Sequence, residues 1–195
     1  METKEANKGT GAGGAMTNEN GIKLEERVRD IFTYMFEPII RIGNINQIWN
    51  IIKGSFKGDN RIFFRASEHA FRKWDIRHKF SVDINEYSKK CLHGAKEPDD
   101  AFIDMNNKVI YWIECKVQKK SGSKCEVLQT YNLKIRNLKE RYPEYTINYI
   151  YVLDQNLRQL CPKEISYMEE DNIRIVWDDD PEFEKKLLNV LELNK

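Results

Sequence analysis

The sequence predicts an α/β domain with a mixed central β-sheet flanked by helices, and three observations support this prediction. Residues 22–36 place apolar side chains at helical spacing, and residues 99–117 form two apolar runs around a short polar turn. Residues 126–142 return to helical spacing before the apolar run 146–154. Helical and strand patterns that alternate in this way are typical of a sheet covered by helices.

Size and composition suit one folded domain. The 195 residues are 41% apolar and 11% aromatic, which is enough to build a core. All apolar runs are short, so we expect no membrane contact, and the N-terminus lacks the basic and apolar regions of a signal peptide. We expect a cytoplasmic protein in which residues 1–15 are a disordered tail or an expression remnant and residues 16–195 are a single domain.

The cysteines show no metal-binding spacing. Cys91, Cys115, Cys125 and Cys161 form no CxxC pair, and no histidine stands at zinc-ligand spacing from them. We therefore expect free thiols in a reducing compartment.

The first half of the chain begins with a regular helix and then becomes irregular. Residues 22–36 predict an amphipathic helix that stops at Pro38. Three weaker elements are expected after it: a helix over 44–56 that ends near Gly54, a helix over 61–74 with Ser67 as a possible cap, and a short strand over 78–84.

The second half gives sharper signals. Residues 99–105 and 109–117 predict a β-hairpin, with an Asn-Asn turn that can adopt positive φ. A Ser-Gly-Ser break precedes the helix over 126–142, and two strands are expected over 146–154 and 172–178. A final helix is expected with Asp180 as its cap and Pro181 in its first position.

Charged side chains within the hairpin indicate a site. Side chains alternate across a strand, so Glu114 and Lys116 share one face. The hairpin brings the start of the other strand alongside them, where Pro98, Asp99 and Asp100 stand. Two carboxylates can hold Mg²⁺ through oxygen, and a nearby lysine can stabilise charge that develops on a phosphate. The alternative is a structural ion cluster.

This Pro-Asp, fourteen-residue, Glu-x-Lys spacing resembles the PD-(D/E)xK nuclease superfamily, the fold of many type II restriction endonucleases. The resemblance covers residues 22–178 and implies a restriction-endonuclease-like core, ordered as helix, three-stranded meander, helix and strand. It also implies catalysis by Asp99, Glu114 and Lys116, with Asp99, Glu114 and the backbone carbonyl of Cys115 as metal ligands. The implied cofactor is Mg²⁺, for which Mn²⁺ is expected to substitute.

Further carboxylates are weaker candidates. Asp100 is an alternative to Asp99, because the Asp-Asp doublet leaves the register open. The resemblance also implies that a glutamate of the first helix can approach the metal, which makes Glu25 or Glu26 a candidate. Asp104 is less favoured, since it lies within the strand and follows no proline.

The charge distribution suits a polyanionic partner. The net charge is only +1, yet residues 53–90 hold ten Lys or Arg against five Asp or Glu, and residues 116–141 hold eight against two. Residues 163–195 are acidic, with five Lys or Arg against ten Asp or Glu. Solvated surface charge is the alternative explanation.

Candidate DNA contacts follow the Glu-x-Lys motif. A flexible turn at a helix start suits phosphate, and the pattern GSxxExxQT resembles a subset of restriction-enzyme-like proteins. The expected contacts are Lys119, Lys120, Ser121, Ser123, Lys124 and Gln129. Residues 39–95 are expected to be a DNA-recognition insertion, and the candidates for base contacts are Arg61, Arg65, Arg72, Arg77 and Lys134.

These observations predict a Mg²⁺-dependent type II restriction endonuclease that leaves 5′-phosphate and 3′-hydroxyl ends on double-stranded DNA. A chain with one active site would act as a homodimer on a symmetric site, and a companion DNA methyltransferase is expected in the same system. Two alternatives stay open: a structure-selective repair or junction nuclease, and a catalytically inactive DNA-binding module.

Overall fold

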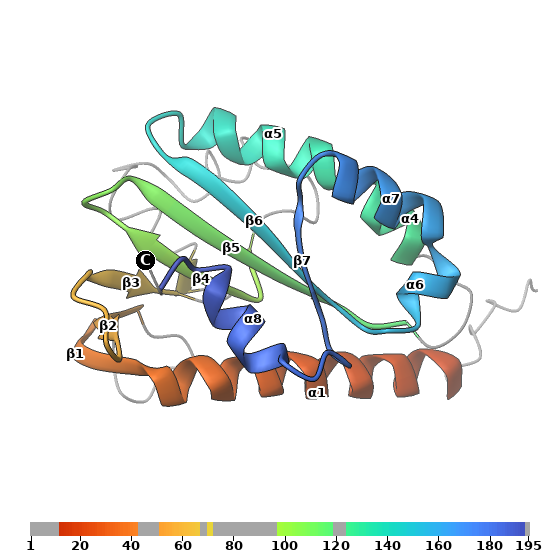
Figure 1. The fold of residues 1–195 in the computed structure, drawn as a ribbon, viewed down its shortest axis with the longest axis horizontal. Helices are drawn as coiled ribbons and strands as arrows, with labels where there is room; N and C mark the ends of the chain where they lie inside the picture. Colours follow the sequence, from red (N-terminus) through yellow and green to blue (C-terminus); the bar gives the residue numbers. More distant parts are fainter. Residues whose placement is uncertain (1–11, 43–50, 67–69, 72–96, 119–123, 194–195) are drawn as a thin grey trace, which may run out of the picture.

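The computed structural model describes residues 12–42, 51–66, 70–71, 97–118 and 124–193. These residues fold as an α/β domain with an open, seven-stranded mixed sheet between helices (Figure 1), so the expected α/β class and mixed central sheet are confirmed. The strands are β1 (Phe36–Ile42), β2 (Ile51–Phe56), β3 (Phe63–Arg65), β4 (Asp100–Asp104), β5 (Val109–Lys116), β6 (Thr146–Leu153) and β7 (Arg174–Trp177).

The strands lie in the sheet in the same order as in the chain. β1 to β5 form an antiparallel meander, whereas β6 runs parallel to β5 and β7 runs parallel to β6. Parallel neighbours need a crossover connection, and the helices before β6 and before β7 supply these crossovers.

The helices form two layers, one on each face of the sheet (Figure 1). Side chains of α1 (Ala12–Met35) and α8 (Phe183–Asn189) pack on one face. The other face is covered by α4 (Lys124–Gln129), α5 (Tyr131–Arg141), α6 (Leu157–Leu160) and α7 (Pro162–Glu170).

The apolar stripe of α1 anchors the first layer. Leu24, Val28 and Phe32 recur every four residues and are buried together with Phe36, as helical spacing requires. Ile22, which the sequence placed on the same stripe, is instead 53% exposed. The helix begins at Ala12, inside the tail expected over residues 1–15.

Two predicted helices are wrong over most of the residues that the structure describes, and only Ala70 and Phe71, within the helix expected over 61–74, are helical. Ile51–Phe56 and Phe63–Arg65 are strands of the sheet, so β3 is the strand that pairs with β4 in the meander. Burial alternates along β3 and over residues 54–56 of β2, as expected for strands, and the apolar runs concealed this period. The strand expected over 78–84 lies outside the described residues, and the described part of 39–95 forms most of β1, then β2 and β3.

The expected hairpin is confirmed, but its turn works differently. β4 and β5 pair with Asp104 opposite Val109, and the positive φ falls on Lys108 rather than on an asparagine. The Asp104 carboxylate accepts hydrogen bonds from the backbone N–H groups of Asn106 and Asn107 at 3.0 and 2.9 Å. Asp104 therefore stabilises the turn, in line with its low rank as a metal ligand.

The C-terminal half follows the predicted elements with three differences. The helix expected over 126–142 breaks at Thr130 into α4 and α5. Neither α6 nor α7 was expected from the sequence, although Pro162 occupies the first turn of α7 and Ile165 and Met168 form a buried pair at helical spacing. The last helix begins at Phe183, after a turn in which the Asp180 carboxylate accepts the Glu182 N–H at 2.9 Å.

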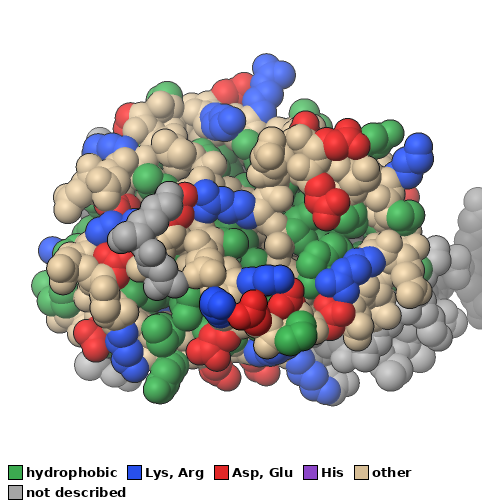
Figure 2. All heavy atoms as spheres, viewed as in Figure 1, with side chains coloured by type: hydrophobic (Ala, Val, Ile, Leu, Met, Phe, Trp, Pro, Cys, Tyr) green, Lys and Arg blue, Asp and Glu red, His purple; other side chains and the backbone are tan. Residues whose placement is uncertain are grey.

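The surface around α8 has mixed charge. Figure 2 shows Lys and Arg side chains interspersed with Asp and Glu on this face, rather than gathered into one basic patch. The visible, described part of this face therefore offers no continuous basic surface to a polyanion. Among the described helices, none combines the length and the apolar composition that crossing a bilayer requires.

Candidate active site

The register of the hairpin places Asp99 beside Glu114. Asp100 pairs with Ile113 in the β4–β5 ladder, and the Asp99 N–H donates to the Ile113 carbonyl at 3.1 Å. The antiparallel ladder therefore sets Asp99 opposite Glu114, on the face toward the α4–α7 layer. The Asp99 carboxylate also accepts the Cys115 N–H at 2.6 Å, which fixes it against β5.

The ammonium of Lys116 lies where three oxygen atoms converge. Its Nζ is 2.8 Å from Glu114 Oε1, 2.9 Å from the Cys115 carbonyl oxygen and 3.9 Å from Asp99 Oδ2. These oxygens belong to the three residues that the resemblance implied as metal ligands. The expected catalytic trio of Asp99, Glu114 and Lys116 therefore comes together. The three oxygen atoms already surround the positive charge of Lys116.

Two side chains outside the motif also hold Glu114. Lys134 of α5 donates to Glu114 Oε1 at 2.7 Å, and the Tyr149 hydroxyl of β6 donates to Oε2. The Glu114, Lys116 and Lys134 side chains are only 12%, 15% and 11% exposed. This cluster is thus a buried ion network rather than a surface pair.

The network keeps Glu114 charged. Burial raises the pKa of its carboxyl, but the positive charges of Lys116 and Lys134 and their hydrogen bonds outweigh burial and lower the pKa to about 2. Burial lowers the pKa of the Lys116 ammonium, and the attraction of Glu114 and Asp99 reverses this and raises it. Glu114 is therefore an anion and Lys116 a cation at neutral pH.

Asp100 lies apart from this network. Its carboxylate accepts from Arg65 Nη2 at 2.7 Å and from Nε at 3.0 Å, and both residues are buried on the α1 side of the sheet. Arg65 also donates to the Thr33 hydroxyl at 2.9 Å. Asp100 thus anchors β4 to β3 and α1, whereas Asp99 is the member of the Asp-Asp doublet that lies near Lys116.

The two glutamates of α1 differ in position. Glu25 is half-buried and lines a small pocket of about 10 Å³ together with Asp99 and Cys115, whereas Glu26 is exposed. Glu25 is therefore the candidate that lies nearer the trio.

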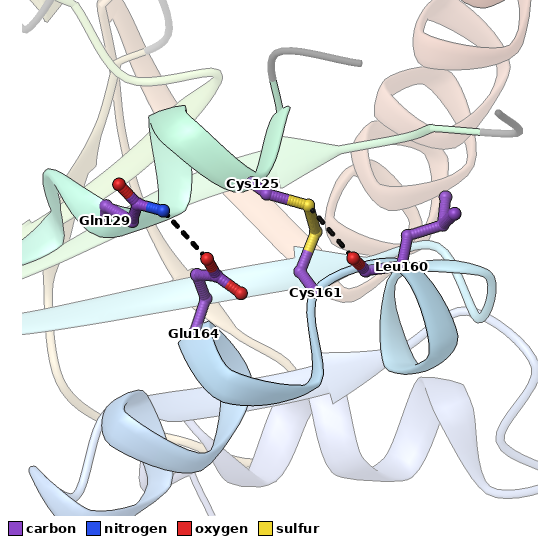
Figure 3. Close-up of a disulfide and its surroundings, with 5 residues drawn as sticks. All are labelled: Cys125, Gln129, Leu160, Cys161 and Glu164. Carbon is purple, nitrogen blue, oxygen red and sulfur yellow. Dashed lines mark hydrogen bonds between the residues drawn. A yellow bond between two sulfur atoms is a disulfide. The ribbon is translucent and has the colours of Figure 1, made fainter. Parts of the chain in front are cut away.

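Most of the expected DNA contacts lie outside the described residues, namely Lys119, Lys120, Ser121 and Ser123. Lys124 begins α4. The Gln129 amide donates to Glu164 Oε1 at 2.8 Å, so in this structure it contacts α7 (Figure 3). Among the base-contact candidates, Arg61 pairs with Asp59 at 2.6 Å and Arg65 is buried with Asp100.

Lys134 and Tyr149 are the site residues that sequence reasoning missed. From the sequence, Lys134 is a candidate for base contact, and Tyr149 is one residue of an expected apolar strand. A parallel pairing of β5 with β6 would have placed Tyr149 near Glu114. In this ladder Trp112, two residues before Glu114, pairs with Tyr149. The contact from α5, however, depends on how that helix crosses the sheet.

The expectation of free thiols is wrong for two cysteines. Cys125 and Cys161 form a disulfide with a Cα–Cα distance of 5.4 Å, across 36 residues of sequence (Figure 3). No CxxC spacing predicts this disulfide. Cys125 and Cys161 approach each other only because α4 and the start of α7 pack together in the fold. Cys115 is free and buried, and Cys91 lies outside the described residues.

The donor set at the trio fits a hard divalent cation. Asp99 and Glu114 offer carboxylate oxygens and Cys115 offers a backbone carbonyl, which are the ligands that Mg²⁺ and Mn²⁺ prefer. The structural observation behind this fit is that three of these oxygens already surround the Lys116 ammonium. No protein-family model, curated protein or solved structure matches the chain.

Proposed function

We propose that this protein is a Mg²⁺-dependent nuclease that hydrolyses phosphodiester bonds of double-stranded DNA, with a PD-(D/E)xK core. The observation that carries the proposal is the convergence of Asp99, Glu114 and the Cys115 carbonyl on the Lys116 ammonium. The element order supports it as well, because a helix, an antiparallel meander, a helix and a parallel strand occur in the order the resemblance implies.

Each site residue has a defined task in this reaction. Asp99, Glu114 and the Cys115 carbonyl would hold the cation, which when bound supplies Lewis-acid polarisation of a phosphoryl oxygen and lowers the pKa of a nucleophilic water. Lys116 stabilises negative charge on the phosphate oxygens and orients the attacking water. Lys134 and Tyr149 hold the Glu114 carboxylate in place while Lys116 turns toward substrate.

Within this class we favour a restriction-type enzyme that acts as a homodimer on a symmetric sequence. One active site cuts one DNA strand, so two protomers related by a twofold axis would cut both DNA strands of a palindrome. The basic segment that follows Lys116 in the sequence is the proposed contact to the phosphate backbone.

A plasmid assay tests the proposal. Purified protein is incubated with supercoiled plasmids of different sequence and Mg²⁺, and the fragment ends are mapped for 5′-phosphate and 3′-hydroxyl groups. Discrete fragments are expected with Mg²⁺ or Mn²⁺ and none with a chelator. Glu114→Gln and Lys116→Ala should each lower the cleavage rate by at least about a hundredfold, while DNA binding in Ca²⁺ persists.

Glu140→Gln is the matched control. Glu140 lies on α5, as Lys134 does, but its side chain is 59% exposed and pairs with Arg136 away from the trio. This variant should cleave at the wild-type rate. Cleavage confined to junctions or nicks, without sequence preference, would favour a structure-selective nuclease. Salt-sensitive DNA binding without any Mg²⁺-dependent turnover would refute the proposal and leave a DNA-binding module.

A further inference from the structure

A second cluster of metal-ligating atoms lies away from the trio, between α4 and α7. The Sγ atoms of Cys125 and Cys161 and a carboxylate oxygen of Glu164 all lie within 4.8 Å of one another. Figure 3 shows the three residues facing one another across the contact between the two helices. Cys161 is fully buried, whereas Cys125 and Glu164 are half-buried, so the cluster is anchored on one side and accessible on the other.

In the structure the two sulfur atoms are joined, and opening their bond changes the chemistry of the cluster. A cellular dithiol supplies two electrons and two protons: the Sγ–Sγ bond breaks, two thiols form and the dithiol leaves as its own disulfide. Two thiols and a carboxylate then stand on one rigid pair of helices. Thiolates select borderline and soft cations such as Zn²⁺ over Mg²⁺.

We propose that the reduced protein binds Zn²⁺ through Cys125, Cys161 and Glu164. Binding releases the two thiol protons to solvent and forms two Zn–S bonds and one Zn–O bond, with a fourth position left for water. A cavity of about 320 Å³ lies next to the cluster on the Glu164 side, where Gln129, Tyr131 and Glu164 form part of its lining.

Two surrounding features favour this ligand set. The Gln129 amide donates to Glu164 Oε1 at 2.8 Å and orients the carboxylate, the role that outer hydrogen bonds play at metal sites. Cys161 directly precedes Pro162, the first residue of α7, and a helix N-terminus stabilises a thiolate. The surroundings of the three ligands therefore orient the Glu164 carboxylate and stabilise the Cys161 thiolate.

Disulfide and zinc are mutually exclusive states of the same pair of sulfurs. The oxidised protein has no thiolate to offer and retains only Glu164, whereas zinc in the reduced protein occupies both sulfurs and protects them from oxidation. The proposal does not depend on nuclease activity, because the cluster uses none of the residues of the trio.

Cobalt substitution tests the site directly. The full chain is reduced with a phosphine, freed of reductant without oxygen and titrated with Co²⁺. A thiolate-to-cobalt charge-transfer band with the strong visible bands of tetrahedral Co²⁺ is expected at one equivalent, and Zn²⁺ should abolish both. The oxidised protein should show neither band. A disulfide that resists the phosphine in the folded protein, or a reduced protein without the band, would overturn the proposal.

Variants identify the ligands. Cys161→Ser should remove the charge-transfer band, whereas Glu140→Gln should keep it, because Glu140 is exposed on α5 and pairs with Arg136. Glu164→Gln preserves shape and should raise the Co²⁺ dissociation constant by at least about tenfold, with a smaller rise for Gln129→Ala. Circular dichroism checks that each variant is folded, and unchanged affinity in folded Glu164→Gln would exclude the three-ligand site.

Discussion

At the scale of single residues, two adjacent aspartates have opposite tasks. Asp99 faces the α4–α7 layer, is 28% exposed and accepts the Cys115 N–H. Asp100 faces α1 and forms a buried bidentate pair with Arg65. The alternation of side chains along the strand is the cause, since one step along the chain changes the face.

Substituting each aspartate separates these tasks. Asp100→Ala leaves the buried Arg65 guanidinium without its partner and should lower the unfolding free energy by about 3–5 kcal/mol. Asp99→Asn keeps an acceptor for the Cys115 N–H and should change stability by less than about 1 kcal/mol, while it abolishes Mg²⁺-dependent cleavage. Urea unfolding and the plasmid assay measure the two effects. Equal loss of stability in both variants would contradict this assignment.

At the scale of elements, β1 and β2 depend on a single glycine. Their register shifts between Pro38 and Ile40, and Gly54 lies opposite Pro38 at this irregularity. A Cβ at Gly54 would stand 2.3 Å from the Glu37 carbonyl oxygen and 2.7 Å from the Phe36 ring. The close approach of the two backbones therefore excludes any side chain at this position.

Two Gly→Ala variants should change stability in opposite directions. Gly54→Ala forces β1 away from β2 and should lower the unfolding free energy by about 1–3 kcal/mol. Gly21→Ala, within α1 and with nothing within 4 Å of the added Cβ, should raise it by about 0.5–1 kcal/mol. Thermal melting of both variants measures the difference. A Gly54→Ala protein as stable as wild type would show that the strands tolerate separation.

At the scale of the whole molecule, stability depends on pH through the buried network. Glu114 has a pKa of about 2 in the folded protein, against an ordinary value of 4.5, because Lys116 and Lys134 outweigh the effect of burial. Between these pH values the unfolded chain binds more protons than the folded one, so stability rises with pH across this window and levels off above it.

The Glu114→Gln variant isolates this contribution. Its melting temperature should rise less steeply than that of wild type between pH 2 and 4.5, because the amide has no proton to lose. Above this window the two curves should run parallel. Identical slopes in both proteins would assign the acid sensitivity to other carboxylates.

The sequence was enough to predict the α/β class, the hairpin and the gathering of Asp99, Glu114 and Lys116. All three follow from local periodicity and from alternation within one hairpin, which need no knowledge of distant contacts. It was not enough for β2 and β3, where short apolar runs suit helix and strand alike. It also missed Lys134 and the Cys125–Cys161 pair, because tertiary packing of the crossover helices creates these contacts, and it missed Tyr149, because that contact depends on the register of β6 beside β5.

The order of the strands has a consequence for how the protein is made. Each described strand after β1 pairs with the described strand that precedes it in the chain, so its partner is already synthesised as the polypeptide leaves the ribosome. Asp99, Glu114 and Lys116 emerge together with one hairpin. Lys134 and Tyr149 follow later, so the charges of the nascent hairpin meet their last partners only when the second half of the sheet arrives.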